Sequence, residues 1–101
     1  MSMPVKVMLH SRIRDVAGLS EIELDPPPGT VGDLVGELAK RFGPGFSQLM
    51  FKENVSSLRD NVVILVNGHS IKMLQGMETP LAVGDKVTAD TLDILEVVGG
   101  G

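Results

Sequence analysis

Residues 62–68 read Val-Val-Ile-Leu-Val-Asn-Gly and combine a strand signal with a turn signal. An unbroken apolar run rich in β-branched residues is typical of a central strand that is covered on both faces. The Asn-Gly pair that follows is the strongest short signal for a hairpin turn, because both residue types tolerate a positive φ. The stretch therefore predicts a central strand over 62–66, a tight turn at Asn67-Gly68 and a short returning strand over 69–72.

On the N-terminal side, two segments alternate apolar and polar residues with the period of half-buried strands. Their apolar rows are Val5, Val7 and Leu9, then Ile22 and Leu24. We expect these two strands to pair as a hairpin, with residues 12–18 as the turn region between them. The prolines at 26–28 end the second strand, because proline cannot donate a hydrogen bond to a ladder.

Residues 30–42 predict one amphipathic helix. Thr30 is a good N-cap, and Asp33 lies three residues later, near the positive end of the helix. The apolar residues recur at helical spacing and form one stripe: Val31, Leu34, Val35, Leu38 and Phe42. Gly43 fits the position just after the helix, and Pro44 blocks its continuation.

The remaining segments complete the order strand, strand, helix, strand, short strand, strand. Residues 46–51 predict a short helical turn, 73–80 a loop, and Val83-Gly84-Asp85 another turn. Residues 86–98 hold one strand, or two strands with a break near Asp90. This order favours an α+β fold in which the helix covers one face of the sheet. If the first and last strands are central neighbours, the C-terminus leaves the sheet as an exposed tail.

The composition narrows the function classes. The chain has 101 residues, which predicts one domain, and its net charge of −4 from 9 basic and 13 acidic residues argues against nucleic-acid binding. It has no cysteine, which excludes disulfides, thiolate metal sites and cysteine nucleophiles. No apolar run is long enough to span a bilayer, and the charged N-terminal segment does not resemble a signal peptide. We therefore expect a cytoplasmic protein with no nucleic-acid or membrane partner.

The internal residues give no self-contained catalytic or metal site. The two histidines, His10 and His69, lack a third ligand, so solvated or strand-edge roles are favoured over a metal pair. Glu78 and Asp85 could form a pair of carboxylates, but an aspartate after glycine is far more often a turn residue. We expect a carrier or co-substrate that works in another protein's active site, rather than an enzyme in its own right.

The sequence ends in Val97-Val98-Gly99-Gly100-Gly101. Glycine packs little and accepts φ and ψ values that other residues refuse, so a glycine run at a carboxylate suggests a thread for a narrow active site. Three extended glycines supply about 10 Å of reach without side chains. A frayed end is the competing interpretation when the tail is taken alone.

Together and in this order, the pieces resemble the MoaD/ThiS family of ubiquitin-like sulfur carriers, and most closely its molybdopterin synthase small subunits. The resemblance rests on residues 5–9, 12–18, 30–34, 63–68, 79–81 and 84–87 and on Gly100-Gly101. It implies a ubiquitin-like β-grasp fold, in which a mixed sheet packs on one main helix. We accordingly expect a β-grasp domain over 1–98 and a flexible glycine tail over 99–101.

The resemblance further implies how the tail works. An E1-like adenylating enzyme of the MoeB/ThiF kind would use ATP with Mg²⁺ to adenylate the Gly101 carboxylate, and sulfur would then replace AMP to give a thiocarboxylate. The thiocarboxylate would donate its sulfur in the large, MoaE-like subunit of molybdopterin synthase or in another acceptor enzyme. The chain itself would bind no cofactor and no metal. Gly101 supplies the carboxylate, Gly100 gives clearance, and the expected partner contacts are Val97, Val98 and Gly99.

Other classes of function stay open. A ubiquitin-like modifier, joined to lysines of target proteins, would use the same tail and the same activation step. Carriers that serve thiamine or a sulfur-containing amino acid would too, whereas a plain interaction module would have no use for the glycines. Within the last strand, we expect Leu92 and Ile94 in the core, and Val97 and Val98 towards the partner.

Overall fold

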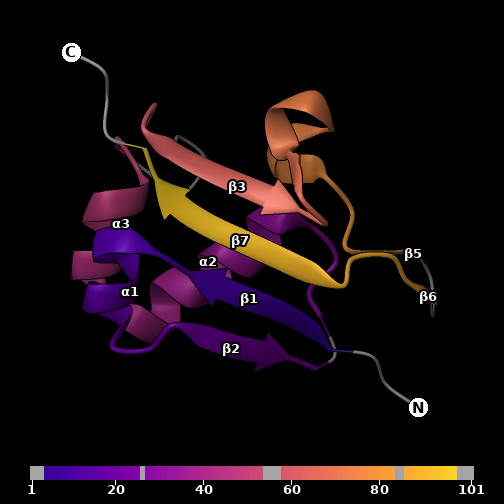
Figure 1. Ribbon diagram of the computed structural model, residues 1–101, viewed down its shortest axis with the longest axis horizontal. Coiled ribbons are helices and arrows are strands. Elements are labelled where there is room, and N and C mark those ends of the chain that lie inside the picture. Colours follow the sequence, from indigo (N-terminus) through magenta and orange to yellow (C-terminus); the bar gives the residue numbers. More distant parts are fainter. Residues whose placement is uncertain (1–3, 26, 54–57, 84–85, 98–101) are drawn as a thin grey trace.

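Five strands form one mixed sheet in the computed structural model, which describes residues 4–25, 27–53, 58–83 and 86–97 (Figure 1). The strands are β1 (Val5–Leu9), β2 (Glu21–Leu24), β3 (Val62–Val66), β4 (His69–Ser70) and β7 (Thr91–Glu96). Their order across the sheet is β2-β1-β7-β3-β4. β1 and β7 run parallel, whereas the other neighbouring pairs run antiparallel. The predicted pairing of the first and last strands is therefore confirmed.

Residues 62–66 form an interior strand, β3, as predicted, but β7 is the middle strand and the predicted cover on both faces of β3 is wrong. β3 lies between β7 and the two-residue β4. Its burial alternates, so that only one face is covered: Val62, Ile64 and Val66 are buried, and Val63 and Leu65 are half-buried. An apolar run marks a strand, but the position of that strand is set by its pairing partners.

Three helices lie against one face of the sheet: α1 (Ser11–Ala17), α2 (Val31–Phe42) and α3 (Pro44–Met50). In Figure 1, α2 passes behind the sheet, while α1 and α3 lie at the edge where β1 and β7 end. The sheet residues that face the helices form two buried rows, Leu9–Ile94–Ile64 and Val7–Leu92–Val66. The predicted α+β fold is confirmed, with α2 as its main helix, and so are the predicted core positions of Leu92 and Ile94.

The helix α2 begins and ends as predicted. The hydroxyl oxygen of Thr30 accepts a hydrogen bond from the backbone N–H of Asp33 at 3.1 Å. At the other end, Gly43 has a φ of 83°, and its N–H donates to the carbonyl of Ala39. Pro44 stops α2 but also starts α3, where its missing N–H is no loss. The apolar stripe is fully buried at Val31, Leu34, Val35 and Leu38.

A segment predicted as a turn is a helix, and a predicted helical turn is confirmed as the short helix α3. Residues 12–18 belong mainly to α1, which buries Ile13 and ends at Gly18 with a φ of 79°. β1 and β2 pair antiparallel as predicted, but α1 connects them instead of a tight turn. α3 is longer than the helical turn predicted over 46–51. Among the helices in the described ranges, not one combines the length and the apolar content needed to cross a membrane.

The Asn67-Gly68 turn is confirmed, with φ values of 52° and 85°. The strand that returns from it is shorter than predicted, because β4 gives way at once to a 3₁₀ helix, η1 (Ile71–Met73). A second 3₁₀ helix, η2 (Gly76–Glu78), lies in the predicted loop.

Residues 86–97 hold two strands, as one of the two predicted alternatives had it. β6 (Lys86–Val87) pairs with β5 (Ala82–Val83) in a small separate hairpin, and β7 follows after a break. Gly84 and Asp85 of the predicted turn lie outside the described residues.

Candidate functional site

The last described residues of the chain lie where β7 leaves the sheet. Glu96, the last residue of β7, lies opposite Val62 of β3. One residue further, the N–H of Val97 donates to the carbonyl oxygen of Asn61 at 2.8 Å. Val97 is 43% exposed and is accessible to a partner. The other predicted site residues, Val98, Gly99, Gly100 and Gly101, lie outside the described residues, and so does the predicted tail over 99–101.

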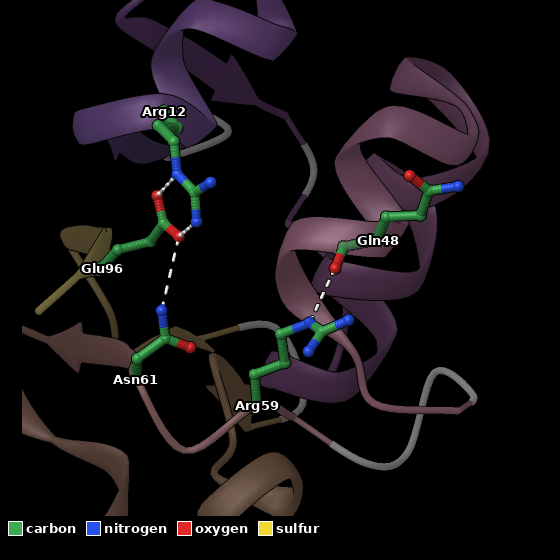
Figure 2. A network of polar contacts seen from close by, with 5 residues as sticks. All are labelled: Arg12, Gln48, Arg59, Asn61 and Glu96. Atoms are coloured by element: carbon green, nitrogen blue, oxygen red, sulfur yellow. Dashed lines mark hydrogen bonds and ion pairs between the residues drawn. The ribbon is translucent and has the colours of Figure 1, made fainter. Parts of the chain in front are cut away.

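A forked ion pair holds the end of β7. Arg12 of α1 donates from Nε to Oε1 of Glu96 at 3.1 Å and from Nη2 to Oε2 at 2.6 Å. Figure 2 shows the guanidinium and the carboxylate facing each other in this arrangement. The Glu96 side chain is only 8% exposed, whereas that of Arg12 is 68% exposed. The hydrogen bond from Arg12 lowers the pKa of Glu96 and burial opposes this change, while the same hydrogen bond raises the pKa of Arg12.

Asn61 contacts Glu96 from the other side. Its side-chain amide donates to Oε2 of Glu96 at 3.4 Å, while its backbone carbonyl holds Val97. The segment that leads to Asn61 is fixed to α3, because Nε of Arg59 donates to the carbonyl of Gln48 at 2.7 Å (Figure 2). The end of β7 is therefore held from α1 and from the start of β3.

His10, between β1 and α1, also forms hydrogen bonds to β7. The N–H of His10 donates to the carbonyl of Ile94 at 3.1 Å, and its Nε2 lies 3.0 Å from Oδ1 of Asp93. Ser11, the next residue, has a φ of 59°, which is uncommon for a residue with a side chain. The structure thus gives His10 a partner on β7, whereas His69 lies on β4.

The sheet face that is turned away from the helices carries half-buried apolar side chains on β1, β3 and β7. Directly paired residues point to the same face, so the register places Met8, Asp93 and Leu65 in one row across three strands. Leu95 and Val63 form the next row, towards the end of β7. On this open face, apolar side chains thus surround the carboxylate of Asp93, and the first row continues to Glu21 of β2 and Ser70 of β4.

Arg12, Asn61 and Glu96 were not among the predicted site residues. One local signal was available, because the alternation that places Leu92 and Ile94 in the core also points Glu96 towards the helices. The identities of its partners depend on how distant segments pair, and no local pattern marks them.

The comparisons with known proteins agree with this geometry. The family model described as the ThiS family matches residues 7–101. A protein of Archaeoglobus fulgidus, named as a candidate sulfur carrier, is 27% identical over 99 residues, which are 98% of this chain and all of that protein.

Two solved structures resemble the chain over nearly its whole length. The small archaeal modifier protein 1 of Methanosarcina acetivorans has a TM-score of 0.77 and 29% identity, and the match covers 100% of this chain and 99% of that one. A protein of Pyrococcus furiosus, named as a candidate subunit 1 of a molybdopterin converting factor, has a TM-score of 0.66 and 28% identity, with 96% and 100% covered. The fold is thus the predicted ubiquitin-like β-grasp, and the chain belongs to the ThiS family of ubiquitin-like sulfur carriers.

Proposed function

We propose that this chain carries sulfur as a thiocarboxylate on Gly101 and delivers it in the synthesis of molybdopterin. The observation that carries this proposal is the end of β7: the last described hydrogen bond of the strand is made by Val97, and the sequence beyond it is one valine and three glycines. Membership of the ThiS family supports sulfur as the cargo. The likeness to the Pyrococcus furiosus protein supports molybdopterin as the destination.

The tail carboxylate needs activation before it can accept sulfur. Its ordinary pKa lies near 3.5, so at neutral pH it is ionised and a poor electrophile. In the proposed step, a carboxylate oxygen of Gly101 attacks the α-phosphorus of ATP held with Mg²⁺ by an E1-like, MoeB/ThiF-like enzyme. Pyrophosphate leaves, and the acyl-adenylate forms. A sulfide then attacks the acyl carbon, and AMP leaves as the thiocarboxylate forms. If the donor is a persulfide, its attack expels AMP and gives an acyl disulfide, and a second thiol of the partner enzyme then attacks the S–S bond, forming a disulfide there and releasing the thiocarboxylate.

The thiocarboxylate then enters a second active site, in a MoaE-like large subunit of molybdopterin synthase. Both active sites must admit the tail without room for side chains, which is why glycine suits Gly100 and Gly101. The chain is a carrier in this scheme, and its partners supply the catalytic groups.

The open face of the sheet is the docking surface that we propose for these partners. Its apolar residues Met8, Leu65 and Leu95 are half-buried, and it lies beside the end of β7. Val97, with Val98 and Gly99 after it, would extend the contact towards the active site. A partner bound here would have the tail at the edge of its interface.

Intact-mass measurement tests the carrier role. The chain is incubated with a MoeB/ThiF-like enzyme, ATP, Mg²⁺ and a sulfur donor, and we expect it to gain the mass difference between sulfur and oxygen. Addition of a MoaE-like subunit with the molybdopterin precursor should then return the mass to its starting value. A chain that never gains sulfur contradicts the proposal. If the thiocarboxylate loses its sulfur only to acceptor enzymes of the thiamine or sulfur amino acid pathways, the chain is a carrier for that pathway and not for molybdopterin.

A second candidate is a protein modifier, favoured by the likeness to the small archaeal modifier protein 1. The adenylated Gly101 would then be attacked by a lysine amine, and AMP would leave as an isopeptide bond forms. Covalent adducts of the chain on other proteins, found by mass spectrometry in the same mixture with added cell extract, would support this role.

A further inference from the structure

The inward row of β7 ends in a charge. Leu92 and Ile94 are fully buried, and the same alternation turns Glu96 towards the helices, opposite the buried Val62. A carboxylate with 8% of its side chain exposed is costly unless it is paired and hydrogen-bonded. Here the fork from Arg12 and the amide of Asn61 meet that need.

We propose that Arg12 is a positioning residue for the tail: its pair with Glu96, supported by Asn61, fixes where β7 ends and thus how much chain is free to enter a partner's active site. This inference rests on the proposed function, because it concerns the delivery of the Gly101 carboxylate. It adds a role for side chains that lie outside the tail itself.

The length of free chain after β7 depends on the register in which β7 pairs with its neighbours. A slip that preserves the inward and outward faces moves the strand by two residues, or about 7 Å. Residues 97–101 can span at most roughly 17–18 Å when fully extended. A slip of this kind would therefore change the reach of the carboxylate by more than a third.

Both alternative registers place a charge in the core row. One slip moves Glu96 into the position of Ile94, away from Arg12, and the opposite slip moves Asp90 into the position of Leu92. An unpaired carboxylate at either position is unfavourable. Only the observed register lets Glu96 meet the guanidinium fork.

The two sides that hold Glu96 are themselves fixed. The positive φ of Ser11, just before Arg12, persists where surrounding contacts over-determine the backbone, and the bond from His10 to Ile94 is one of these contacts. On the other side, Arg59 ties the approach to Asn61 onto α3. α1 and α3 are in close contact, because a Cβ placed on Gly45 of α3 would lie 3.2 Å from a methyl group of Val16 in α1.

Single substitutions test the role of the pair. Arg12→Gln and Glu96→Gln each remove one half, and Arg41→Gln and Glu37→Gln remove the same charges from exposed positions on α2. We expect amide exchange at Val97 to become about tenfold faster in the first two variants, with β1 and β3 still protected. We expect kcat for thiocarboxylate formation to fall about fivefold or more while KM for the carrier stays unchanged, because the docking face is intact. The α2 controls should match the wild type in both measurements.

Two further variants separate positioning from simple loss of structure. Arg12→Lys keeps the charge but cannot make the two parallel bonds, so it should fall between wild type and Arg12→Gln. The double variant Arg12→Met/Glu96→Leu leaves no unpaired buried charge but also no guanidinium fork, so it should recover stability to urea relative to either single variant, while amide exchange at Val97 stays fast and kcat stays low. This recovery keeps the test open if a single variant is too unstable to assay.

The outcomes distinguish this inference from the proposed function. If the wild type accepts sulfur and Arg12→Gln does so with the same kcat and the same Val97 protection, the positioning role is overturned. A higher KM for Arg12→Gln with an unchanged kcat would also overturn it, because that result would mean that Arg12 contributes to partner binding and not to positioning. If the wild type accepts no sulfur, the proposed function fails, and exchange at Val97 still decides whether Arg12 sets the end of β7.

Discussion

The side-chain oxygen of Asn67 accepts a hydrogen bond from the backbone N–H of Asp90, with 2.8 Å between the two atoms. The same oxygen lies 3.2 Å from the backbone nitrogen of Thr91, and the side-chain amide donates to the carbonyl of Thr88 at 3.1 Å. Asn67 thus forms the turn after β3 with its backbone and holds the segment before β7 with its side chain. One residue links the hairpin to the strand that carries the tail.

Asn67→Gly separates these two roles. Glycine adopts the φ of 52° without strain but removes the three side-chain hydrogen bonds, so the free energy of unfolding should fall by about 1–3 kcal/mol. Urea unfolding measures this loss. Asn67→Asp keeps the accepting oxygen and tolerates the positive φ, so it should lose less. If both variants lose the same stability, the bonds to Asp90 and Thr91 contribute nothing.

The start of α2 depends on a single hydroxyl. Thr30→Ala removes the acceptor for the N–H of Asp33, and the loss of such an N-cap costs about 1 kcal/mol. Thr30→Ser retains the hydroxyl and should stay close to the wild type. Thermal unfolding followed by circular dichroism measures both, and equal losses in the two variants would argue against capping as the cause.

A comparison of α2 with α1 shows which helices the sequence can predict. Thr30 and the apolar stripe of α2 are local signals, and the structure confirms them. α1 offers no such signal: its 7 residues are too few for helix propensity to stabilise alone, Ser11 starts it at a positive φ, and no side chain caps it. The buried Ile13 and the pair between Arg12 and Glu96 hold α1 in place, and both depend on residues far away in sequence.

The same limit applies to the candidate site. The alternation in β7 correctly predicted that Leu92 and Ile94 are buried, because that pattern is local. The central position of β7 and the contact of Glu96 with Arg12 depend on pairing with β1 and β3, which no window of sequence contains. The glycine tail stays a prediction from the sequence, whereas the side chains that hold the end of β7 required the structure.

Stability should fall in acid because of Glu96. Arg12 holds the pKa of this carboxyl below its ordinary value of 4.5, mainly by hydrogen bonding, although burial works against the change. A carboxyl with a lower pKa in the folded than in the unfolded state stabilises the fold above its unfolded pKa. That stabilisation is lost as the pH falls from 4.5 through the folded-state pKa. We therefore expect the free energy of unfolding to decrease across this window.

Glu96→Gln isolates this contribution. The difference in unfolding free energy between wild type and Glu96→Gln, measured in urea at several pH values, should narrow below pH 4.5, where protonation removes the same charge. Glu37→Gln, an exposed change on α2, should show no such narrowing. A difference that stays constant from neutral to acid pH would contradict the assigned role of Arg12.

Partner binding should depend on the open face of the sheet. Leu95→Ser removes a half-buried apolar side chain opposite Val63, and loss of an interface anchor costs about 1–2 kcal/mol, or roughly tenfold or more in Kd. Met73→Ser is the matched control, because Met73 is an 84% exposed apolar residue on η1, outside the paired residues of the sheet. Calorimetric titration with the adenylating enzyme measures both. Equal affinities for the two variants would move the docking surface elsewhere.

The proposed function requires the Gly101 carboxylate to reach a set distance beyond Val97, and changes at the last glycines test this requirement. Deleting Gly101 shortens the reach by about 3.3–3.6 Å, and Gly100→Ala widens the thread and restricts its φ and ψ. We expect both changes to abolish or nearly abolish sulfur uptake in the intact-mass assay while urea unfolding is unchanged, because these residues follow the last described bond of β7. A chain extended by one residue beyond Gly101 should also fail unless a protease trims it, since its glycine carboxyl is then an amide. A plain interaction module would tolerate all three changes. Normal sulfur uptake by the chain that lacks Gly101 would contradict the role of Gly101.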